Sequence, residues 1–350
     1  MEDDGWIEQP VAGEPDPDPF AEAVPVPDTE PERCPACDGA DNRVLFEGSD
    51  RLYHTTERVF RVVECRQCRL IRLSPFPSPQ ELRQYYPDTY WFVPEHDAVS
   101  RLEELYRRFV LGDHARFVAK ALGNVSRGEH PAPVLDVGCG GGLFLRMMAE
   151  RGHPVLGLDF SLQAATAAWR VNGVPAICGS LTQAPLPAES CAAVTMFHVL
   201  EHLYDPAVYL EAAHRLLRPD GRLIIQVPNA GCWQMTLLGE HWAGIDIPRH
   251  LFNFRPRDLQ QLLDATGFEI ARTKFFSLRD NPAGLATSLA PGLDPMARRI
   301  RHTRESTGVK LAKDLVYLGL VVGALPFTLL EAACRAGSTV MIEAAKKPRT

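Results

Sequence analysis

The sequence lacks any broad excess of basic residues. The chain of 350 residues has a formal net charge of −7, and residues 1–33 hold eleven acidic residues against one basic residue, Arg33. That segment therefore carries about −10, which leaves the remaining body near +3. A nearly neutral body does not offer the basic surface that binds nucleic acid, so we expect no nucleic-acid partner.

Residues 1–33 also lack a periodic apolar pattern and contain seven prolines. Such a segment cannot bury enough apolar surface to offset its ordering entropy, which predicts a disordered acidic tail. It has neither the basic start nor the apolar core of a signal peptide, so we expect a cytoplasmic protein. The nine cysteines should then be thiols or metal ligands rather than disulfides.

The apolar stretch Leu315–Leu330 falls short of the about 20 residues that a membrane-spanning helix needs, and two glycines and a proline interrupt it. Because 338–344 is predicted to be the last strand of the sheet, a single crossing would put that strand on the wrong side of a membrane. The stretch must return to the core. It is predicted to be a buried helical hairpin, a homodimer contact, or a peripheral contact through 298–330 with the inner face of the membrane.

Length and a hydrophobic content of 45% allow one full-sized core plus a smaller module. An amphipathic helix is predicted over 98–123, with Leu102, Leu105, Phe109 and Val110 at helical spacing. Strand and helix patterns then alternate, which predicts an α/β fold whose parallel sheet is covered on both faces. The predicted strands are 133–138, 154–159, 174–178, 191–197, 221–227 and 268–276.

Four cysteines form two Cys-x-x-Cys knuckles, Cys34-Pro-Ala-Cys37 and Cys65-Arg-Gln-Cys68, separated by 27 residues. Two-residue spacing lets both sulfurs of a knuckle reach one tetrahedral ion, and four thiolates close a structural zinc site. A hairpin around 43–63 can absorb the long gap. A redox pair would need one knuckle and a neighbouring helix start, so we favour structural Zn²⁺ over redox or unrelated thiols.

A glycine-rich turn follows the apolar strand that ends at Asp136, in the segment Val134-Leu-Asp-Val-Gly-Cys-Gly-Gly-Gly142. Gly138 and Gly140 let the backbone approach a ligand closely, and the helix start near Leu143 offers unpaired N–H groups. The spacing D-x-G-x-G-x-G differs from the dinucleotide pattern G-x-G-x-x-G, and the Lys-Ser/Thr of a phosphate-binding loop is absent. The turn therefore suits a nucleoside ligand without phosphates.

Asp159 ends the next predicted strand, about twenty residues further on. An acid at this place can accept both hydroxyls of a ribose. It could instead cap the helix that begins near Ser161. Its pairing with the glycine turn favours ribose binding.

This stretch resembles the class I S-adenosylmethionine-dependent methyltransferases over about 133–277. Further matching segments are Gly179-Ser-Leu181, Ala184-Pro-Leu-Pro187 and Phe197-His-Val-Leu-Glu-His202. The resemblance implies a Rossmann-like fold and S-adenosyl-L-methionine as cofactor. The family usually has Asp where this chain has Ser180, so the backbone at Leu181 is expected to read the adenine. The expected cofactor-binding residues are Asp136, Gly138, Cys139, Gly140, Asp159, Phe160, Ser180, Leu181 and Phe197.

His198 follows the fourth predicted strand, at the sheet edge where open α/β folds bind ligands. A neutral imidazole there could accept the proton that a methyl acceptor loses, or His198 could form only local hydrogen bonds. The segment also fits the H-x-x-E-H pattern of zinc proteases, which we reject because a long helix is missing. Similar ubiquinone-pathway and small-RNA methyltransferases hold a divalent ion with E-x-x-E-H. His198 replaces one of those carboxylates, so we favour catalysis without a metal over an ion held by Glu201 and His202.

The segment 240–254 concentrates Trp242, Asp246, Arg249 and His250 in nine residues, which predicts a loop that covers the substrate. It resembles the W-x-G-x-D-x-P-R-H loop of a bacterial family that joins a zinc ribbon to a methyltransferase core. That resemblance implies a small acceptor, such as a sugar, a glycan precursor or a secondary metabolite. We expect His198 and His250 to be the catalytic residues. An RNA methyltransferase that reads RNA with its zinc ribbon and a non-catalytic cofactor-binding scaffold are the alternatives.

The predicted organisation has five parts. They are a disordered acidic tail (1–33), a zinc-ribbon module (34–90), a cofactor-binding domain (91–280), a hydrophobic helical insertion (281–335) and a final strand with a tail (336–350).

Overall fold

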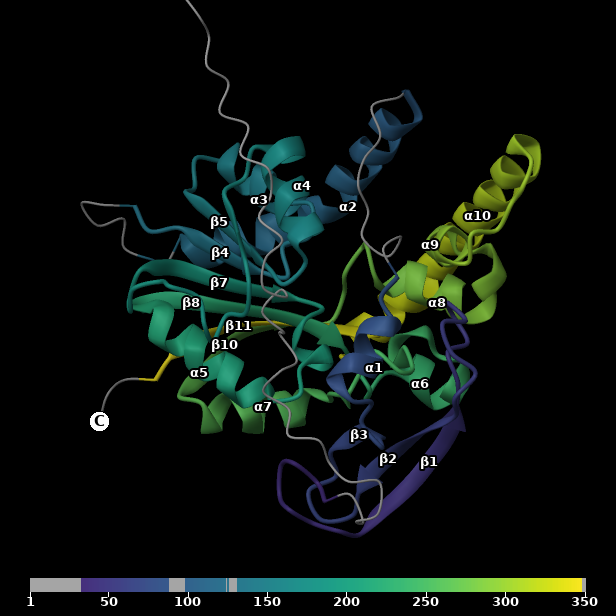
Figure 1. Ribbon diagram of the computed structural model, residues 1–350, viewed down its shortest axis with the longest axis horizontal. Coiled ribbons are helices and arrows are strands. Elements are labelled where there is room, and N and C mark those ends of the chain that lie inside the picture. Colours follow the sequence, from purple (N-terminus) through teal and green to yellow (C-terminus); the bar gives the residue numbers. More distant parts are fainter. Residues whose placement is uncertain (1–32, 88–97, 124, 126–130, 348–350) are drawn as a thin grey trace, which may run out of the picture.

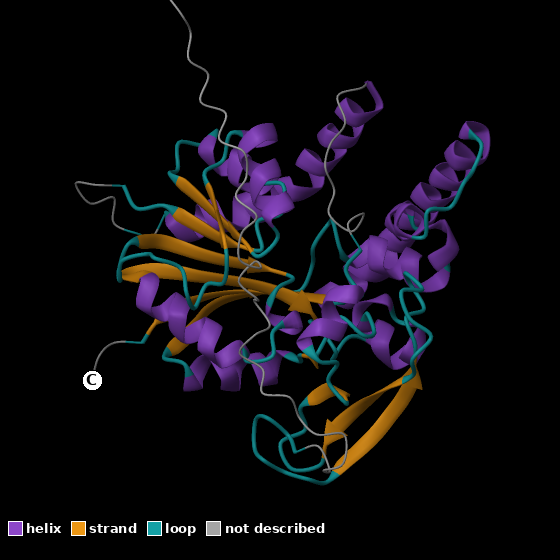
Figure 2. Cartoon of the chain, viewed as in Figure 1, coloured by secondary structure: helices purple, strands orange, loops and turns teal. Residues whose placement is uncertain are grey.

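A seven-stranded sheet forms the centre of the molecule, seen nearly edge-on in the computed structural model (Figures 1 and 2). The structure describes residues 33–87, 98–123, 125 and 131–347, so the predicted acidic tail and the 90/91 boundary lie outside the described residues. The strand order is β10-β11-β8-β7-β4-β5-β6. The strands are β4 (Val134–Val137), β5 (Val155–Asp159), β6 (Ala176–Cys178), β7 (Cys191–Phe197), β8 (Leu217–Pro228), β10 (Phe268–Lys274) and β11 (Thr339–Lys346).

The predicted α/β sheet is confirmed, with one difference in strand direction. Strands β4 to β8 pair in parallel, but β11 is antiparallel to both β8 and β10. The last strand, expected at 338–344, therefore lies inside the sheet between two other strands. The segment 281–335 lies between β10 and β11, so it leaves the sheet and returns to it, as the sequence indicated.

Helices cover both faces of the sheet and build two cores. On one face lie α2 (Ala98–Leu122), α3 (Leu143–Ala149) and α4 (Leu162–Asn172), packed through Phe117, Leu145 and Ala168. On the other lie α5 (Pro206–Leu216) and α7 (Pro256–Ala265), packed through Leu210 and Leu263. The second core continues without a break into the N-terminal module.

Side-chain caps start two of these helices, α4 just after β5 and α5 after the turn that follows β7. The Ser161 hydroxyl accepts the Ala164 N–H at the start of α4, and Asp205 accepts two N–H groups at the start of α5. Both caps satisfy amides that a helix start leaves unpaired. They hold the turns at the carboxyl edge of the sheet, where the candidate site lies.

The N-terminal module is a small antiparallel sheet of β1 (Asn42–Gly48), β2 (Phe60–Cys65) and β3 (Ile71–Ser74), followed by α1 (Pro79–Gln84). The expected hairpin is therefore confirmed as the pair β1–β2. A fourth strand, β9 (Phe252–Asn253), comes from far along the chain and pairs with β3. The sequence did not predict this strand, because two residues carry no periodic signal.

Two arginines connect the module to the large domain. Arg249 has no exposed side-chain surface, donates to both oxygens of Asp50 at 2.9 Å and also binds Asp246. Arg255, at the start of α7, donates to Glu64 of β2 at 3.0 Å. Each arginine joins residues that lie about 190 or more positions apart.

The C-terminal excursion contains α8 (Asn281–Leu289), α9 (Pro295–Ile300) and α10 (Thr307–Ala333). α10 is one continuous helix with an exposed side, so the expected buried hairpin is wrong. Within the described residues it is the one helix long and apolar enough to cross a membrane, although β11 returns directly from it to the sheet. α10 and the first half of α2 both project beyond the sheet (Figure 1).

The predicted packing of α2 is correct only in part. Val110 is buried, but Leu105 and Phe109 are 64% and 67% exposed. Only the second half of α2 packs against the sheet, because the first half projects beyond the sheet (Figure 1).

Candidate active site

The turn after β4 is shaped for a close ligand. Gly138 and Gly140 have φ angles of 70° and 52°, in the region that favours glycine. A Cβ on Gly138 would approach Val199 to 2.7 Å, whereas a Cβ on Gly140 would meet no atom within 4 Å. The backbone at Gly140 therefore borders free space, while Gly138 packs tightly behind it. Cys139 turns its buried sulfur toward Gly157 of β5, so it can offer a ligand only its backbone.

Two buried carboxylates flank this turn. Asp136 accepts a hydrogen bond from the Thr195 hydroxyl at 2.5 Å, and burial raises the pKa of Asp136 to about 7. Asp159 accepts the Gly140 N–H at 2.8 Å and the Ser161 N–H at 2.9 Å, one on each oxygen. Burial raises the pKa of Asp159 to about 6, despite these two bonds. Each Asp159 oxygen keeps a further lone pair with which it can accept a ribose hydroxyl.

The remaining residues expected to bind the cofactor lie on neighbouring strands of the same edge. Ser180 follows β6, and its hydroxyl bonds with Thr182 and Tyr209, so it is already engaged within the protein. The Leu181 side chain is fully buried, which leaves its backbone as the available group. Phe160 follows β5, and Phe197 ends β7 in edge-to-face contact with Phe144. The strand order β7-β4-β5-β6 therefore brings all nine predicted residues to one edge.

His198 follows β7 directly and adopts a left-handed backbone with φ of 56°, held by its N–H donating to the Gln226 carbonyl at 2.8 Å. Its Nδ1 lies 3.3 Å from Glu201 Oε1, and its Nε2 lies 3.5 Å from Asp280 Oδ1. Burial lowers the pKa of His198, but the two carboxylates outweigh burial and raise it to about 9. The side chain is 24% exposed, whereas Glu201 is 1% exposed, so the imidazole is the accessible member of this pair.

Three residues near His198 were missed by the sequence reasoning. Asp280 begins α8 and accepts hydrogen bonds from Gln226 at 2.6 Å and from Ser277 at 2.5 Å. His114 of α2 is fully buried, 3.8 Å from Asp280, and burial lowers its pKa to about 4. Gln226 could have been identified from the sequence, since it is a polar amide inside the apolar run of β8. Asp280 could not, because an Asp just before a helix ordinarily caps that helix.

His202 and His250 lie behind Glu201. The Nδ1 atoms of both rings face backbone carbonyls, those of Arg249 and Gly244 at 3.0 and 2.9 Å. The ring centroids are 4.6 Å apart, and His250 Nε2 is 4.0 Å from Glu201 Oε1. Glu201, His202 and His250 can place one ligand atom each within 4.8 Å of the others, so this group has the composition of a metal site. His250 is buried, and its contact with His198 runs through Glu201.

The loop 240–254 differs from its expected role as a cover for the substrate. Trp242 is 3% exposed, and Arg249 is bonded to Asp50 and lies over the Tyr53 ring at 4.3 Å. These side chains face the N-terminal module rather than the glycine turn. Large and charged side chains cluster in this loop because it packs against the N-terminal module. A short sequence motif cannot distinguish residues that serve such packing from residues that bind a substrate.

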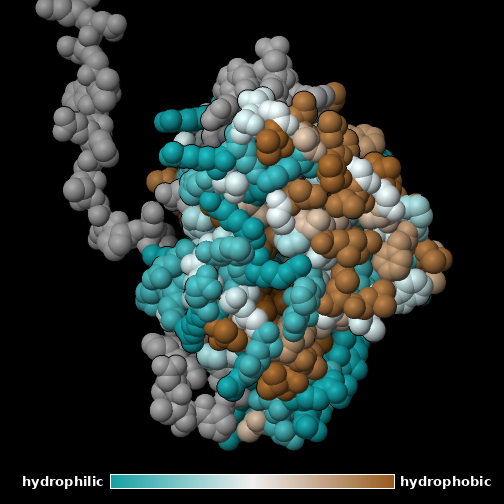
Figure 3. All heavy atoms as spheres, turned by 90° about the vertical axis from the view of Figure 1, so that its right-hand side faces the viewer, coloured by the Kyte–Doolittle hydropathy of each residue, from teal (hydrophilic) through white to brown (hydrophobic). Residues whose placement is uncertain are grey.

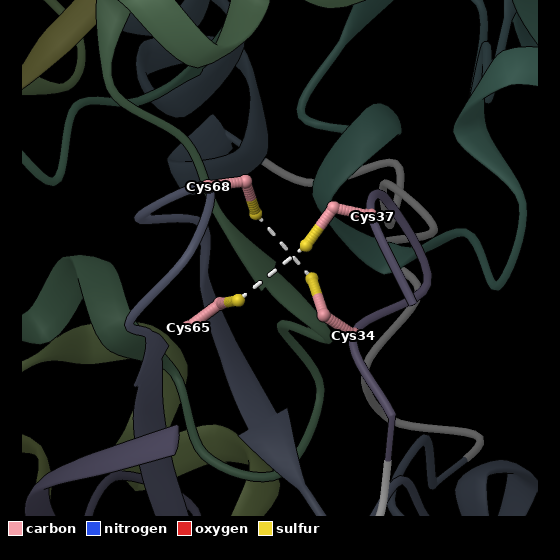
Figure 4. Close-up of side chains that lie close together, drawn as sticks. All are labelled: Cys34, Cys37, Cys65 and Cys68. Carbon is pink, nitrogen blue, oxygen red and sulfur yellow. Dashed lines mark hydrogen bonds between the residues drawn. The ribbon is translucent and has the colours of Figure 1, made fainter. Parts of the chain in front are cut away.

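The four cysteines of the two knuckles meet at one point (Figure 4). The sulfurs of Cys34 and Cys68 are 3.5 Å apart, those of Cys37 and Cys65 are 3.6 Å apart, and all four lie within 4.8 Å of one another. Tetrahedral zinc with Zn–S bonds of about 2.3 Å needs sulfurs about 3.8 Å apart, so the arrangement fits that ion. None of the nine cysteines, all of which lie within the described residues, forms a disulfide.

Comparisons with known proteins identify the central region. The model of a methyltransferase domain family matches residues 106–273. A protein of Mycolicibacterium smegmatis, named a probable S-adenosylmethionine-dependent methyltransferase, is 33% identical over 144 residues, which span 40% of this chain and 53% of that protein. The ubiquinone biosynthesis O-methyltransferase of Salmonella paratyphi A is 30% identical over 183 residues, which span 49% of this chain and 74% of that enzyme.

A solved S-adenosylmethionine-dependent methyltransferase from Archaeoglobus fulgidus aligns with a TM-score of 0.45 and 20% identity, over 71% of this chain and all of that one. The chain spans about half of the mycobacterial relative and three quarters of the Salmonella enzyme. The matched residues contain the glycine turn, Asp159 and His198 in the order and sheet positions described above. The chain belongs to the class I S-adenosylmethionine-dependent methyltransferases.

Proposed function

We propose that the enzyme methylates a hydroxyl of a small acceptor, such as a sugar, a glycan precursor or a secondary metabolite, beside His198. The observation that carries the proposal is a partly exposed imidazole, held between two carboxylates, at the end of the strand next to the glycine turn. The names of the O-methyltransferase relatives support oxygen as the accepting atom. The near-neutral body favours a small acceptor over RNA.

The cofactor residues follow from the geometry of the sheet edge. Asp159 would accept the ribose hydroxyls, the backbone at Gly140 would lie against the ligand, and Leu181 would offer its backbone to the adenine. Asp136 would supply negative charge toward the cationic methionine part. When bound, S-adenosylmethionine supplies an electrophilic methyl group, so the protein needs mainly to position the acceptor.

His198 would take the acceptor proton. From the hydroxyl that receives the methyl group, a ring nitrogen of His198 would accept the proton that the oxygen loses. Asp280 and Glu201 stabilise the imidazolium that results. Their charge also keeps most of the imidazole protonated at neutral pH, since its pKa is about 9. His250 would act as a positioning residue, because it contacts Glu201 and not the open side of His198.

We further propose that Cys34, Cys37, Cys65 and Cys68 hold one structural zinc ion, and that 34–90 acts as a zinc module attached to the cofactor-binding domain. With four sulfur ligands, the ion has no open position for catalysis. Zinc would therefore stabilise the fold without touching the acceptor.

The test is transfer of a labelled methyl group to a panel of phenols, sugars and glycans. His198→Ala should lower turnover by roughly 10²–10⁴, and cofactor binding should stay nearly intact. His241→Ala removes an exposed histidine and should leave turnover unchanged. A fully active His198→Ala would refute the base. Activity that is lost with a chelator and restored by magnesium would instead assign a catalytic ion to Glu201, His202 and His250.

A further inference from the structure

The surface of α10 is inverted relative to a helix of a soluble protein. From Leu311 to Leu330 its exposed positions carry no charged residue. They are occupied by leucine, valine, alanine, glycine and proline, at positions 311, 312, 315, 316, 318, 319, 322, 323, 326, 329 and 330. A surface helix normally shows the reverse pattern, with its polar face toward water.

Polar residues of α10 between 311 and 331 instead bond to other parts of the protein. Tyr317 bonds with the Thr287 hydroxyl at 2.9 Å. Asp314 pairs with Arg298 of α9, and Glu331 accepts the Gln234 side chain at 2.8 Å. The inward face is therefore fixed by specific contacts, so the helix cannot simply rotate to bury its leucines.

The exposed apolar surface extends beyond α10. Space-filling representation of this side shows a broad brown area rather than isolated residues (Figure 3). Exposed apolar residues come from four helices, one of which is the short α6 (Trp233–Leu238): Leu105, Tyr106 and Phe109 of α2, Leu237 of α6, Leu289 of α8, and Leu311, Leu315, Val316, Leu318, Val322, Leu329 and Leu330 of α10. A contiguous apolar area of this kind marks a contact with another apolar phase or protein. We name the exposed residues 311–330 of α10 the docking face.

The charges at the two ends of the docking face have one sign. Among residues 302–335, the exposed positions with basic side chains are His302, Arg304, Lys310 and Arg335, and none of the exposed positions is acidic. The acids of this segment are engaged within the protein: Glu305 binds Arg298 and Lys313, Asp314 binds Arg298, and Glu331 accepts a hydrogen bond from Gln234. Basic residues at the border of an apolar helix face are attracted to anionic lipid headgroups.

We propose that the docking face binds peripherally to an anionic lipid bilayer. A second copy fits the same face less well, because a two-fold contact would bring the basic ends of one α10 against those of the other, while the acids of 302–335 are already engaged within their own chain. A transmembrane arrangement does not fit, since β11 follows α10 and lies between β8 and β10. The helix therefore lies along the bilayer surface.

The docking face is close to the candidate active site in the fold. α10 packs on α8, and Asp280, the residue that begins α8, lies 3.5 Å from His198. The proposal itself requires only the docking face and does not depend on methyl transfer.

Sedimentation with lipid vesicles tests the proposal without an activity assay. The full chain should sediment with vesicles of phosphatidylcholine and phosphatidylglycerol in equal parts, and at least about tenfold less with phosphatidylcholine alone. Raised salt should weaken binding, because it screens the basic border. The double variant Leu315→Asp/Val322→Asp should lose binding at least about tenfold, since it places charges on the face that enters the lipid.

The double variant Val44→Asp/Trp169→Asp is the matched control. It changes two exposed apolar residues on β1 and α4 and should bind vesicles like the wild type. Thermal melting of both variants shows whether they fold, and the salt and lipid dependence of the wild type tests the proposal if they do not. A wild-type chain that stays in the supernatant with anionic vesicles would overturn it. A dimer that the Leu315/Val322 change dissociates, with no vesicle binding, would assign the face to a second copy.

Discussion

His198 carries a positive charge that a general base must first lose. Asp280 and Glu201 raise its pKa to about 9, although burial alone would lower it. Only the neutral imidazole can accept a proton, so we expect turnover to rise about tenfold per pH unit up to about pH 9. A pH profile of turnover checks this.

Asp280→Asn should move the rising limb of that profile to lower pH. The change removes one carboxylate, so less charge opposes the loss of the proton from His198. The shift separates a positioning residue from one that only supports the fold, which would lower turnover at all pH values equally. A limb that stays near pH 9 would show that Asp280 does not set the basicity of His198.

Arg249 is fully buried between Asp50 and Asp246. Arg249→Met should lower the free energy of unfolding by about 3–5 kcal/mol, because it leaves the carboxylates of Asp50 and Asp246 without the cation that pairs them. Burial raises the pKa of Asp50, but Arg249 outweighs it and lowers the pKa to about 2. The stabilisation is therefore present above pH 3.8 and is lost as the pH falls toward 2, where the variant and the wild type should converge.

Denaturant unfolding at several pH values measures this difference. Arg257→Met is the control. Arg257 lies in α7 with a half-exposed side chain, so its removal should change the free energy of unfolding little. Asp50→Asn offers a milder change if Arg249→Met does not fold. Equal stability of Arg249→Met and the wild type at neutral pH would show that the ion pairs of Arg249 do not stabilise the contact between the N-terminal module and the large domain.

At the scale of elements, the sequence predicted what periodicity and spacing encode. The strands around 134–137 and 191–197 were expected close to their bounds, because short apolar runs mark both of them in the sequence. The antiparallel β11 and the two-residue β9 were not foreseeable, since strand direction and pairing depend on tertiary contacts. The same limit applies to the site. His198 and the glycine turn were visible in sequence, but Asp280 reaches His198 only through the fold.

The turn after β4 and the end of β5 form one cofactor-binding unit, because Asp159 bonds to Gly140. Asp159→Ala should weaken S-adenosylmethionine binding at least about tenfold, since it removes hydrogen bonds to a charged acceptor worth roughly 1.5–3 kcal/mol each before compensation. Affinity should rise between pH 5 and pH 8, because burial raises the pKa of Asp159 to about 6 and of Asp136 to about 7, and a cation prefers their ionised forms.

Calorimetry over this pH range gives both results. Glu211→Ala removes an exposed carboxylate of α5 and should leave affinity unchanged. Unchanged affinity in Asp159→Ala, or tighter binding of a nicotinamide dinucleotide, would contradict the assignment of this edge to S-adenosylmethionine.

At the scale of the whole molecule, the N-terminal module and the large domain are interlocked. β9 belongs to the large domain in sequence but completes the module's sheet, and one apolar core runs through both parts. Arg249 and Arg255 add ion pairs between the module and the large domain. The two parts should therefore unfold together. Loss of order in the module should also change the position of His250, which lies two residues before β9.

Zinc removal tests this coupling. Metal analysis should show close to one zinc per chain, and Cys34→Ser or Cys68→Ser should lose it, because each removes one of four sulfur ligands. Since zinc binding contributes directly to folding, both variants should lower the melting temperature of the entire chain in a single transition. Cys334→Ser, at an exposed cysteine on another part of the chain, is the matched control and should keep both zinc and stability. Full retention of zinc in Cys34→Ser and Cys68→Ser would reject the four-sulfur site. Two separate transitions, with only the smaller one shifted, would keep the site but show that the module folds independently of the sheet that carries His198.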